Sequence, residues 1–217
     1  MTARGERSPR RARRSRVLPR AFYDRDTAVV ARDLLGAILE CESPEGITAG
    51  RIVETEAYLG EDDPACHAAV GHTIRTAPLY GRPGTAYVYF IYGRYWCVNA
   101  VTRAAGLPSA VLIRAVEPVA GIELMRARRP RARSDHELTN GPSKLCLAME
   151  IDARHNGLSL LEPPLTIREG DTIEDRDVLV TPRIGITKAA EWPLRWLVRG
   201  NSYVSKTPRH FEQRALL

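Results

Sequence analysis

Two carboxylates separated by one residue stand out first, in the segment Arg51-Ile-Val-Glu-Thr-Glu-Ala-Tyr58. The β-branched residues and the alternation of this segment predict a strand on which Glu54 and Glu56 share one face, about 7 Å apart. Two anions at that spacing raise each other's cost of ionising, so one of them could act as a base near neutral pH. The alternative is a solvated strand face that carries two surface glutamates.

A cluster of tyrosines follows in residues 84–99. Aromatic and β-branched residues up to Ile91, a glycine at position 93 and a return run over 95–101 predict a β-hairpin. Tyr92 then lies at the tip, where its ring cannot be buried in its own sheet. We therefore expect Tyr92 to insert into a partner, whereas Tyr87 and Tyr89 could simply be core residues.

The remaining elements must hold these two segments together. The folded part is expected to begin near Leu18, and Asp26 can cap a helix over 27–35 that stops at Gly36. A long loop region over 59–83 holds His67. With no internal repeat and no linker, the pattern indicates one mixed α/β (α+β) domain rich in antiparallel strands. The other predicted strands span 37–41, 47–58, 110–117, 165–168, 178–185 and 194–199, and the other predicted helices span 121–128 and 144–149.

The positive charge is concentrated at the N-terminus. The 217 residues carry a net charge of +6, but residues 1–20 alone carry +7 and the rest carry −1. We therefore predict a disordered basic tail over 1–17 and a folded domain over 18–217. The tail could hold a polyanion by counterion release, or it could be a dispensable solvated extension. No apolar run is long enough for a membrane span, so none is expected. The charged N-terminus contains no apolar segment of the kind found in a secretory signal, so no such signal is expected either.

The cysteines argue against metal chemistry. Cys41, Cys66, Cys97 and Cys146 show no close pairing and no C-x-x-C, which predicts reduced thiols in a cytosolic compartment and no zinc site. His67 follows Cys66 directly, but two neighbours without further partners make a poor metal site. The phosphate-binding, dinucleotide-binding and nucleophile-elbow motifs are also missing. We expect neither a metal nor a cofactor.

Two other segments could meet a phosphate. Five arginines surround Pro130, and we interpret them as a solvated loop rather than a phosphate contact. Residues 140–143 open the helix predicted over 144–149, and the free N–H groups at such a helix end suit a phosphate. The five arginines are Arg126, Arg128, Arg129, Arg131 and Arg133.

Carboxylates, clustered tyrosines, a histidine and an arginine together suit hydrolysis at a sugar carbon, where a carboxylate activates water beside an oxocarbenium-like centre. Several blocks in order make the interpretation specific: 51–58, 65–67, 83–93, 112–118, 140–145, 183–186 and 196–200. Over about residues 18 to 206 the chain resembles the alkyladenine (3-methyladenine) DNA glycosylase family. The resemblance implies a single compact domain with a curved antiparallel sheet, flanking helices and a protruding β-hairpin.

The resemblance also implies roles for the matching side chains. Glu56 falls on the family's general base, which deprotonates the water that attacks C1′, and Arg114 falls on the arginine beside that water and the phosphate. Arg114 could otherwise be an ordinary ion-pair partner of Glu56, and Glu54 is interpreted as the structural carboxylate. The pocket for the extruded base would be formed by Tyr58, His67 and Tyr89, and Asn99 would crowd the amino group of normal guanine. Tyr92 would fill the gap left in the duplex. Two further residues, Arg94 and Lys144, are candidates for contacts with the DNA backbone.

The function implied by the resemblance is that of a monofunctional DNA glycosylase in base excision repair. It would flip alkylated or deaminated purines (3-methyladenine, 7-methylguanine, hypoxanthine and ethenoadenine) out of duplex DNA and hydrolyse the N-glycosidic bond, leaving an abasic site. No lysine lies within the two core motifs, so no lyase activity is expected. The partner would be damaged double-stranded DNA, bound by a monomer, in the cytoplasm (nucleoid-associated) of a bacterium or the nucleus of a eukaryote.

Departures from the family leave the damage preference open. Thr76 stands where the family often has asparagine, and Leu79-Tyr80 stands where Met-Phe is common. Two other classes of function also stay open. One is a nucleic-acid-binding module whose tyrosines stack on bases without turnover, and the other is a carbohydrate-directed hydrolase that uses Glu54 and Glu56.

Overall fold

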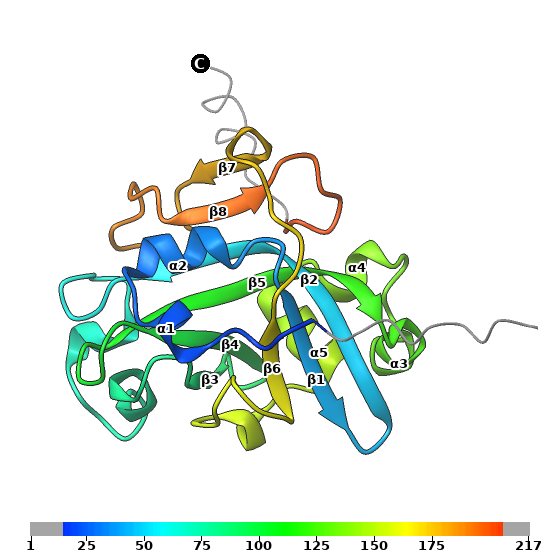
Figure 1. The fold of residues 1–217 in the computed structure, drawn as a ribbon, viewed down its shortest axis with the longest axis horizontal. Coiled ribbons are helices and arrows are strands. Elements are labelled where there is room, and N and C mark those ends of the chain that lie inside the picture. The colour runs from blue at the N-terminus through cyan, green and yellow to red at the C-terminus, as the bar shows by residue number, and fades with distance from the viewer. Residues whose placement is uncertain (1–14, 206–217) are drawn as a thin grey trace, which may run out of the picture.

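Two long neighbouring strands form the centre of the sheet in the computed structural model, which describes residues 15–205 (Figure 1). β2 (Gly46–Tyr58) pairs antiparallel with β5 (Ser109–Ala120), and the register shifts near Ile52, Glu54 and Thr55. Irregularities of this kind bend a strand and change where its side chains point. The shifts lie on both sides of Glu54, one of the two carboxylates that the sequence singled out.

Eight strands make up the sheet in the described part of the chain, and all their pairings are antiparallel. The main path runs β3-β4-β5-β2-β1-β6; β1 pairs with the first half of β2, β8 pairs with its second half, and β7 pairs with β8. The α+β prediction is confirmed. The remaining strands are β1 (Ile38–Ser43), β3 (Ala86–Ile91), β4 (Tyr95–Thr102), β6 (Leu165–Arg168), β7 (Val178–Thr181) and β8 (Arg195–Val198).

Short helices flank the sheet. Asp26 caps α2 as predicted, because its Oδ1 accepts the N–H groups of Ala28 at 2.9 Å and Val29 at 3.2 Å. The helices are α1 (Arg20–Tyr23), α2 (Thr27–Asp33), α3 (Ile122–Arg128), α4 (His136–Thr139) and α5 (Pro142–Met149), with 3-10 turns η1 (His67–Val70), η2 (Ala77–Tyr80), η3 (Ala153–His155) and η4 (Asp175–Asp177).

One strand prediction is wrong in its second half. The strand expected over 178–185 ends at Thr181, because Pro182 has no N–H group to give to a ladder. The chain then turns toward the end of β2, where the backbone N–H of Ile184 meets Glu56. This early end therefore brings a segment of the chain to the candidate site.

The core fixes the orientation of β2. Thr55 is fully buried and its hydroxyl donates to the carbonyl oxygen of Ala31 in α2 at 2.8 Å. Glu54 and Glu56, on either side of Thr55, instead both contact Arg114 of β5. Apolar side chains from α2, α5 and the central strands fill one continuous core, among them Leu34, Leu39, Ile52, Ile113, Leu145 and Met149.

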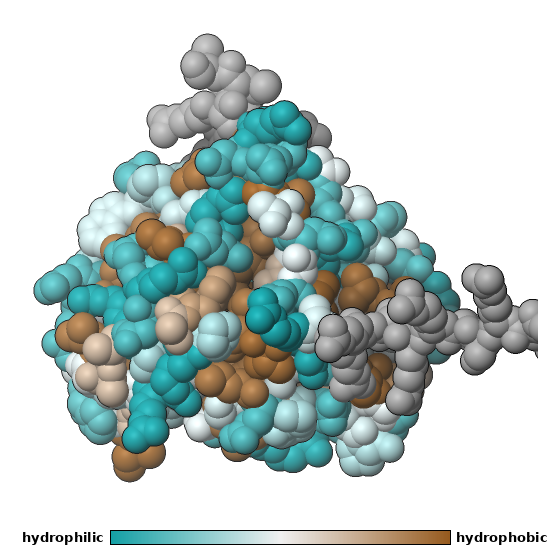
Figure 2. Space-filling view, in the orientation of Figure 1, coloured by the Kyte–Doolittle hydropathy of each residue, from teal (hydrophilic) through white to brown (hydrophobic). Residues whose placement is uncertain are grey.

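Polar residues cover most of the face seen in Figure 2, with apolar residues in separate patches. No helix between residues 15 and 205 is both long and apolar enough to cross a bilayer. Most of the predicted basic tail lies outside the described residues, so its disorder stays a prediction. At the described end, Val17 forms an antiparallel bridge with Arg168, and Arg16 pairs with Glu169.

Candidate functional site

A cavity of about 310 Å³ opens beside the β3–β4 hairpin. Its wall comes from the hairpin, the end of β2, β5, η1, the start of α5 and the segment after β7. Six of the side chains that the sequence singled out line it, namely Tyr58, His67, Tyr89, Tyr92, Asn99 and Arg114. Glu56 is fully buried and lies behind this lining, in contact with three of the lining residues, Tyr58, Arg114 and Ile184.

Glu56 is held by three donors. The Tyr58 hydroxyl donates to its Oε2 at 2.9 Å, the Arg114 Nη1 lies 3.1 Å from the same oxygen, and the N–H of Ile184 donates to Oε1 at 2.7 Å. Burial and the Glu56 carboxylate raise the pKa of Tyr58. The tyrosine therefore stays a neutral donor at neutral pH, and the carboxylate keeps a fixed direction toward the cavity wall.

Glu54 is not part of a solvated face. It is fully buried, and its Oε1 accepts from Arg114 Nε and Arg195 Nε, each at 2.7 Å. Burial alone would raise the pKa of Glu54, but the two guanidinium groups and Ser205 lower it below the ordinary value. The expected repulsion between the two carboxylates is thus outweighed at Glu54, which is an ion-paired anion and not a proton acceptor.

Aromatic rings form the wall of the cavity. The His67 and Tyr89 ring centroids are 4.5 Å apart with an interplanar angle of 71°, and the Tyr87 and Tyr89 centroids are 5.3 Å apart. His67 Nδ1 lies 2.9 Å from the Tyr87 hydroxyl. Burial and nearby Arg75 lower the pKa of His67, so its ring is neutral at neutral pH. A flat ring can stack here on neutral, electron-rich surfaces.

Asn99 is fixed by its own strand pairing. It is buried on β4, opposite Tyr87 in the ladder, and its Nδ2 donates to the Tyr87 carbonyl oxygen at 2.9 Å. Because the amide is held this way, Asn99 presents a rigid polar group to the cavity that it lines. Such a group can discriminate between rings that differ in an exocyclic substituent.

Tyr92 occupies the tip of the predicted hairpin, which the structure confirms. Tyr92 and Gly93 both have positive φ, 54° and 62°, and the N–H of Arg94 donates to the Ile91 carbonyl oxygen at 3.2 Å. This is the geometry of a type I′ turn, and it is uncommon for a tyrosine. The Tyr92 side chain is 82% exposed. An exposed ring held in a strained backbone conformation is a candidate for insertion.

The two candidates for DNA backbone contacts lie outside the cavity lining. Arg94 follows the turn, with its guanidinium carbon 5.5 Å from the Tyr95 ring centroid. Lys144 lies in the first turn of α5, and its Nζ donates to Asn140 Oδ1 at 2.7 Å. Both flank the site, and their contact with DNA stays a prediction.

Sequence reasoning missed the ion pair that supports Tyr58. Asp63 and Arg183 are both fully buried, and Arg183 Nη2 donates to Asp63 Oδ1 at 2.9 Å. The Arg183 guanidinium lies 4.7 Å from the Tyr58 ring centroid. Block 183–186 carried part of the family resemblance, but nothing in the sequence alone indicated a partner 120 residues away.

The residues that depart from the family pattern differ in their distance from the site. Leu79 is buried and lines the cavity, so its shape bears directly on the ring that fits. Thr76 is buried in the loop, where its hydroxyl donates to the Gly71 carbonyl oxygen at 2.9 Å. The Tyr80 hydroxyl donates to Glu61 at 2.6 Å, which raises the pKa of Tyr80 to about 12.

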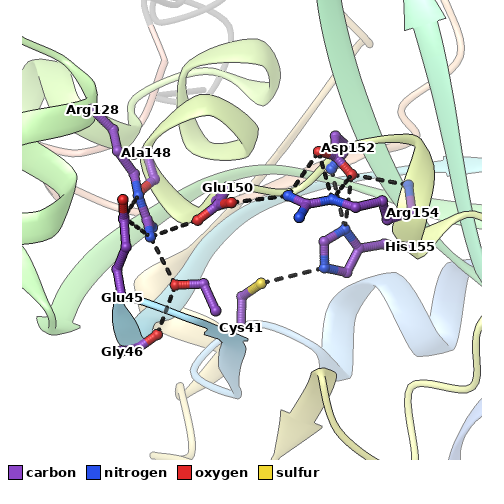
Figure 3. A network of polar contacts seen from close by, with 10 residues as sticks. Cys41, Glu45, Gly46, Arg128, Ala148, Glu150, Asp152, Arg154 and His155 are labelled. Atoms are coloured by element: carbon purple, nitrogen blue, oxygen red, sulfur yellow. Dashed lines mark hydrogen bonds and ion pairs between the residues drawn. The ribbon is translucent and has the colours of Figure 1, made fainter.

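A second constellation resembles a nucleophilic triad but cannot act as one (Figure 3). Cys41 Sγ lies 3.6 Å from His155 Nε2, and Asp152 lies on the other side of the ring. The backbone N–H of Asp152 donates to His155 Nδ1 at 3.2 Å. A neutral imidazole that accepts at Nδ1 carries its proton on Nε2, so it cannot take the proton of the thiol. Burial raises the pKa of Cys41 to about 12.

We expect the cysteines to be inert in the folded protein, because all four are buried and burial raises the pKa of each thiol. A chromogenic thiol reagent at pH 8 should label them slowly in the native state and label all four quickly in denaturant. One rapidly labelled native thiol would contradict this expectation.

The arginines around Pro130 do not form one solvated cluster. Arg126 pairs with Asp135 at 2.7 Å. Arg128 donates from Nη2 to both Glu45 and Glu150 at 2.7 Å (Figure 3). The interpretation as a solvated loop is therefore wrong for Arg128, which joins the β1–β2 turn to the end of α5. Between residues 15 and 205, no group of three or more His, Cys, Asp or Glu residues could hold a metal ion.

Comparisons with known proteins show the family of this chain. Residues 21–202 match the family model described as methylpurine-DNA glycosylase (MPG). The chain belongs to that family. It is 51% identical over 180 residues to a protein of Methanocella arvoryzae, covering 82% of this chain and 89% of that protein. It is 46% identical over 191 residues to one of Carboxydothermus hydrogenoformans, covering 88% and 99%. Both carry the name "Putative 3-methyladenine DNA glycosylase".

Family membership confirms the predicted resemblance and the class of enzyme. The protein is a methylpurine-DNA glycosylase and thus a hydrolase that acts on N-glycosyl bonds. The matched region includes both strands that carry Glu56 and Arg114 and the whole hairpin. The two alternatives, a binding module without turnover and a carbohydrate-directed hydrolase, find no support in these comparisons.

Proposed function

We propose that this methylpurine-DNA glycosylase flips a damaged purine out of duplex DNA into the aromatic cavity and hydrolyses its N-glycosidic bond with a water activated by Glu56. The observation that carries the proposal is the arrangement of Glu56, a fully buried carboxylate that three donors hold directly behind the cavity lining. A carboxylate fixed beside a cavity with aromatic walls can take a proton from water at the moment that water attacks C1′.

For a cationic alkylated purine the proposed step balances without any further group, whereas a neutral base such as hypoxanthine leaves as an anion that takes a proton from solvent water. The water oxygen forms a bond to C1′, the C1′–N bond breaks, and its electron pair leaves with the base. Glu56 takes one proton of the water, and Arg114 stabilises the charges around the attacking oxygen. A cationic alkylated purine leaves as a neutral base, so it needs no acid, and it stacks well on the Tyr58, His67 and Tyr89 rings.

The outer part of the site would handle the duplex. Extrusion of a base costs a few kcal/mol, least at a damaged pair. The exposed Tyr92 ring would fill the gap and offset ~1–3 kcal/mol by stacking. Arg94 and Lys144 would meet the backbone, and Asn99 would reject guanine through its amino group. One chain supplies all these side chains, so we propose that the enzyme acts as a monomer. We further propose that it acts on the genome, in the cytoplasm of a bacterium or the nucleus of a eukaryote.

The test is base release in the presence of a chelator. The substrates are methylated DNA, which holds 3-methyladenine and 7-methylguanine, and duplexes that hold one hypoxanthine or one ethenoadenine. We expect free base and an unbroken strand that alkali cleaves. Because the cavity lining contains no lysine, borohydride should trap no covalent complex. Absence of release from every substrate, or a trapped complex, would overturn the proposal.

Tyr92 can be tested separately. Replacement of Tyr92 by Ser should lower single-turnover base release from a paired lesion about tenfold or more, because the stacking that offsets extrusion is lost. Release from the same lesion in single-stranded DNA should change much less, since no gap needs filling there. An equal loss on both substrates would show that Tyr92 acts in the pocket rather than at the gap.

A further inference from the structure

Glu54 is the most heavily coordinated buried carboxylate near the site, although it does not line the cavity. In addition to its two arginines, it accepts the Ser205 Oγ at Oε1 and the Ser205 backbone N–H at Oε2, each at 2.7 Å. Arg195 is itself fully buried, and its Nη1 donates to Thr181 at 3.0 Å. Three segments distant in the chain, β5, β8 and residue 205, therefore converge on one carboxylate.

The Arg114 guanidinium is shared unequally between the two carboxylates. Its Nε lies 2.7 Å from Glu54, its Nη1 lies 3.1 Å from Glu56, and its Nη2 donates to Ser205 Oγ at 3.4 Å. The side facing Glu54 and Ser205 thus has two partners, and the shorter ion pair is the one with Glu54. Glu54 and Ser205 therefore hold the guanidinium through Nε and Nη2, and only Nη1 contacts Glu56.

We propose that Glu54 is a positioning residue. Together with Arg195 and Ser205 it fixes the Arg114 guanidinium, and it competes with Glu56 for the ion pair with that group. This inference rests on the proposed role of Glu56 as the base. A carboxylate that one arginine neutralises completely is a weak base, because the ion pair must be broken or weakened before the proton is accepted. By competing for Arg114, Glu54 leaves Glu56 more able to take a proton.

The charges around Glu54 and Glu56 determine how removal of the Glu54 charge should affect Glu56. Glu54, Glu56, Arg114 and Arg195 sum to zero, and they are buried. Within residues 15–205, Glu56 also accepts from two neutral donors, Tyr58 and the N–H of Ile184. The nearby Cys97 thiol is neutral because burial raises its pKa, and the Arg183 charge behind Tyr58 is matched by Asp63. Removal of the Glu54 charge therefore leaves a net positive charge beside Glu56.

The first experiment is the pH dependence of single-turnover base release by Glu54→Gln. Glutamine keeps the size and can still accept hydrogen bonds, but the net positive charge left beside Glu56 favours its carboxylate form. We expect the acidic limb of the rate–pH profile to move to lower pH by about one unit. The plateau rate should fall about tenfold, because a weaker base takes the proton less readily. Affinity for lesion duplex should stay unchanged.

A second variant tests the proposal in case Glu54→Gln does not fold. Ser205→Ala removes one hydrogen bond to Glu54 and one from Arg114, but it changes no charge. We expect about a fivefold lower plateau rate with the acidic limb in place. Ser109→Ala is the matched control, because Ser109 is also buried and its hydroxyl bonds to Thr102, with no link to Glu54. It should keep the wild-type rate.

The outcomes separate the inference from the proposed function. If Glu56→Gln stays active, the role of Glu56 fails and this inference fails with it. If Glu56→Gln is inactive but the acidic limb of Glu54→Gln coincides with wild type, Glu54 is merely structural and only the inference is overturned. If Glu54→Gln does not fold, equal rates for Ser205→Ala and Ser109→Ala overturn it.

Discussion

Replacement of Glu56 by glutamine should lower the single-turnover rate of base release by ~10²–10⁴-fold. Glutamine has the same shape, and its amide oxygen can accept from the Tyr58 hydroxyl or from the N–H of Ile184. It cannot accept a proton from water. The chemical step is therefore lost while the cavity and its aromatic wall stay in place, so binding of a lesion duplex should be retained.

The measurement is release of hypoxanthine or ethenoadenine from a duplex under single-turnover conditions, with affinity measured on the same DNA. Glu40→Gln is the matched control, because Glu40 is also a buried carboxylate paired with an arginine, Arg168 at 3.0 Å, and it does not line the cavity. That variant should release base at the wild-type rate. A wild-type rate in Glu56→Gln would remove Glu56 from the mechanism.

Local patterns in the sequence predicted the elements that carry the site. Alternation around Glu56 predicted β2, the aspartate at 26 predicted the start of α2, and the glycine at 93 predicted the hairpin turn. Each depends on residues that are neighbours in the chain, so backbone geometry and propensity decide them. The roles of the individual side chains came from the family resemblance rather than from these patterns.

Long-range partners could not be predicted in the same way. Glu54 and Ser205 are 151 residues apart, and no periodicity indicates which of many arginines is buried against Glu54. Without the family resemblance, the two glutamates would therefore look alike in the sequence. The structure separates them, because β8 and residue 205 supply partners to Glu54, whereas Tyr58 and Ile184 supply them to Glu56.

The buried ion pair between Asp63 and Arg183 is expected to make a large contribution to the stability of the fold. Asp63→Asn should destabilise the protein by ~3–5 kcal/mol, because it leaves the fully buried Arg183 guanidinium without its carboxylate. In a domain of this size that corresponds to a fall in Tm of about 10 °C. Asp175→Asn is the control: Asp175 also pairs with an arginine, Arg32, but its side chain is 95% exposed, so Tm should not change measurably.

The difference between wild type and Asp63→Asn should shrink in acid. Burial alone would raise the pKa of Asp63, but hydrogen bonds from Arg183 and from the N–H groups of Leu59 and Ala65 lower it below its ordinary value of 3.8. A lowered pKa means that the ionised carboxylate stabilises the fold above about pH 4 and that this contribution is lost as the pH falls through the lowered value. Urea unfolding at pH 7 and pH 3 measures it. Arg183 lies against Tyr58, which in turn holds Glu56. A stability difference that stayed constant with pH would therefore mean that Asp63 and Arg183 support this end of β2 by packing rather than by charge.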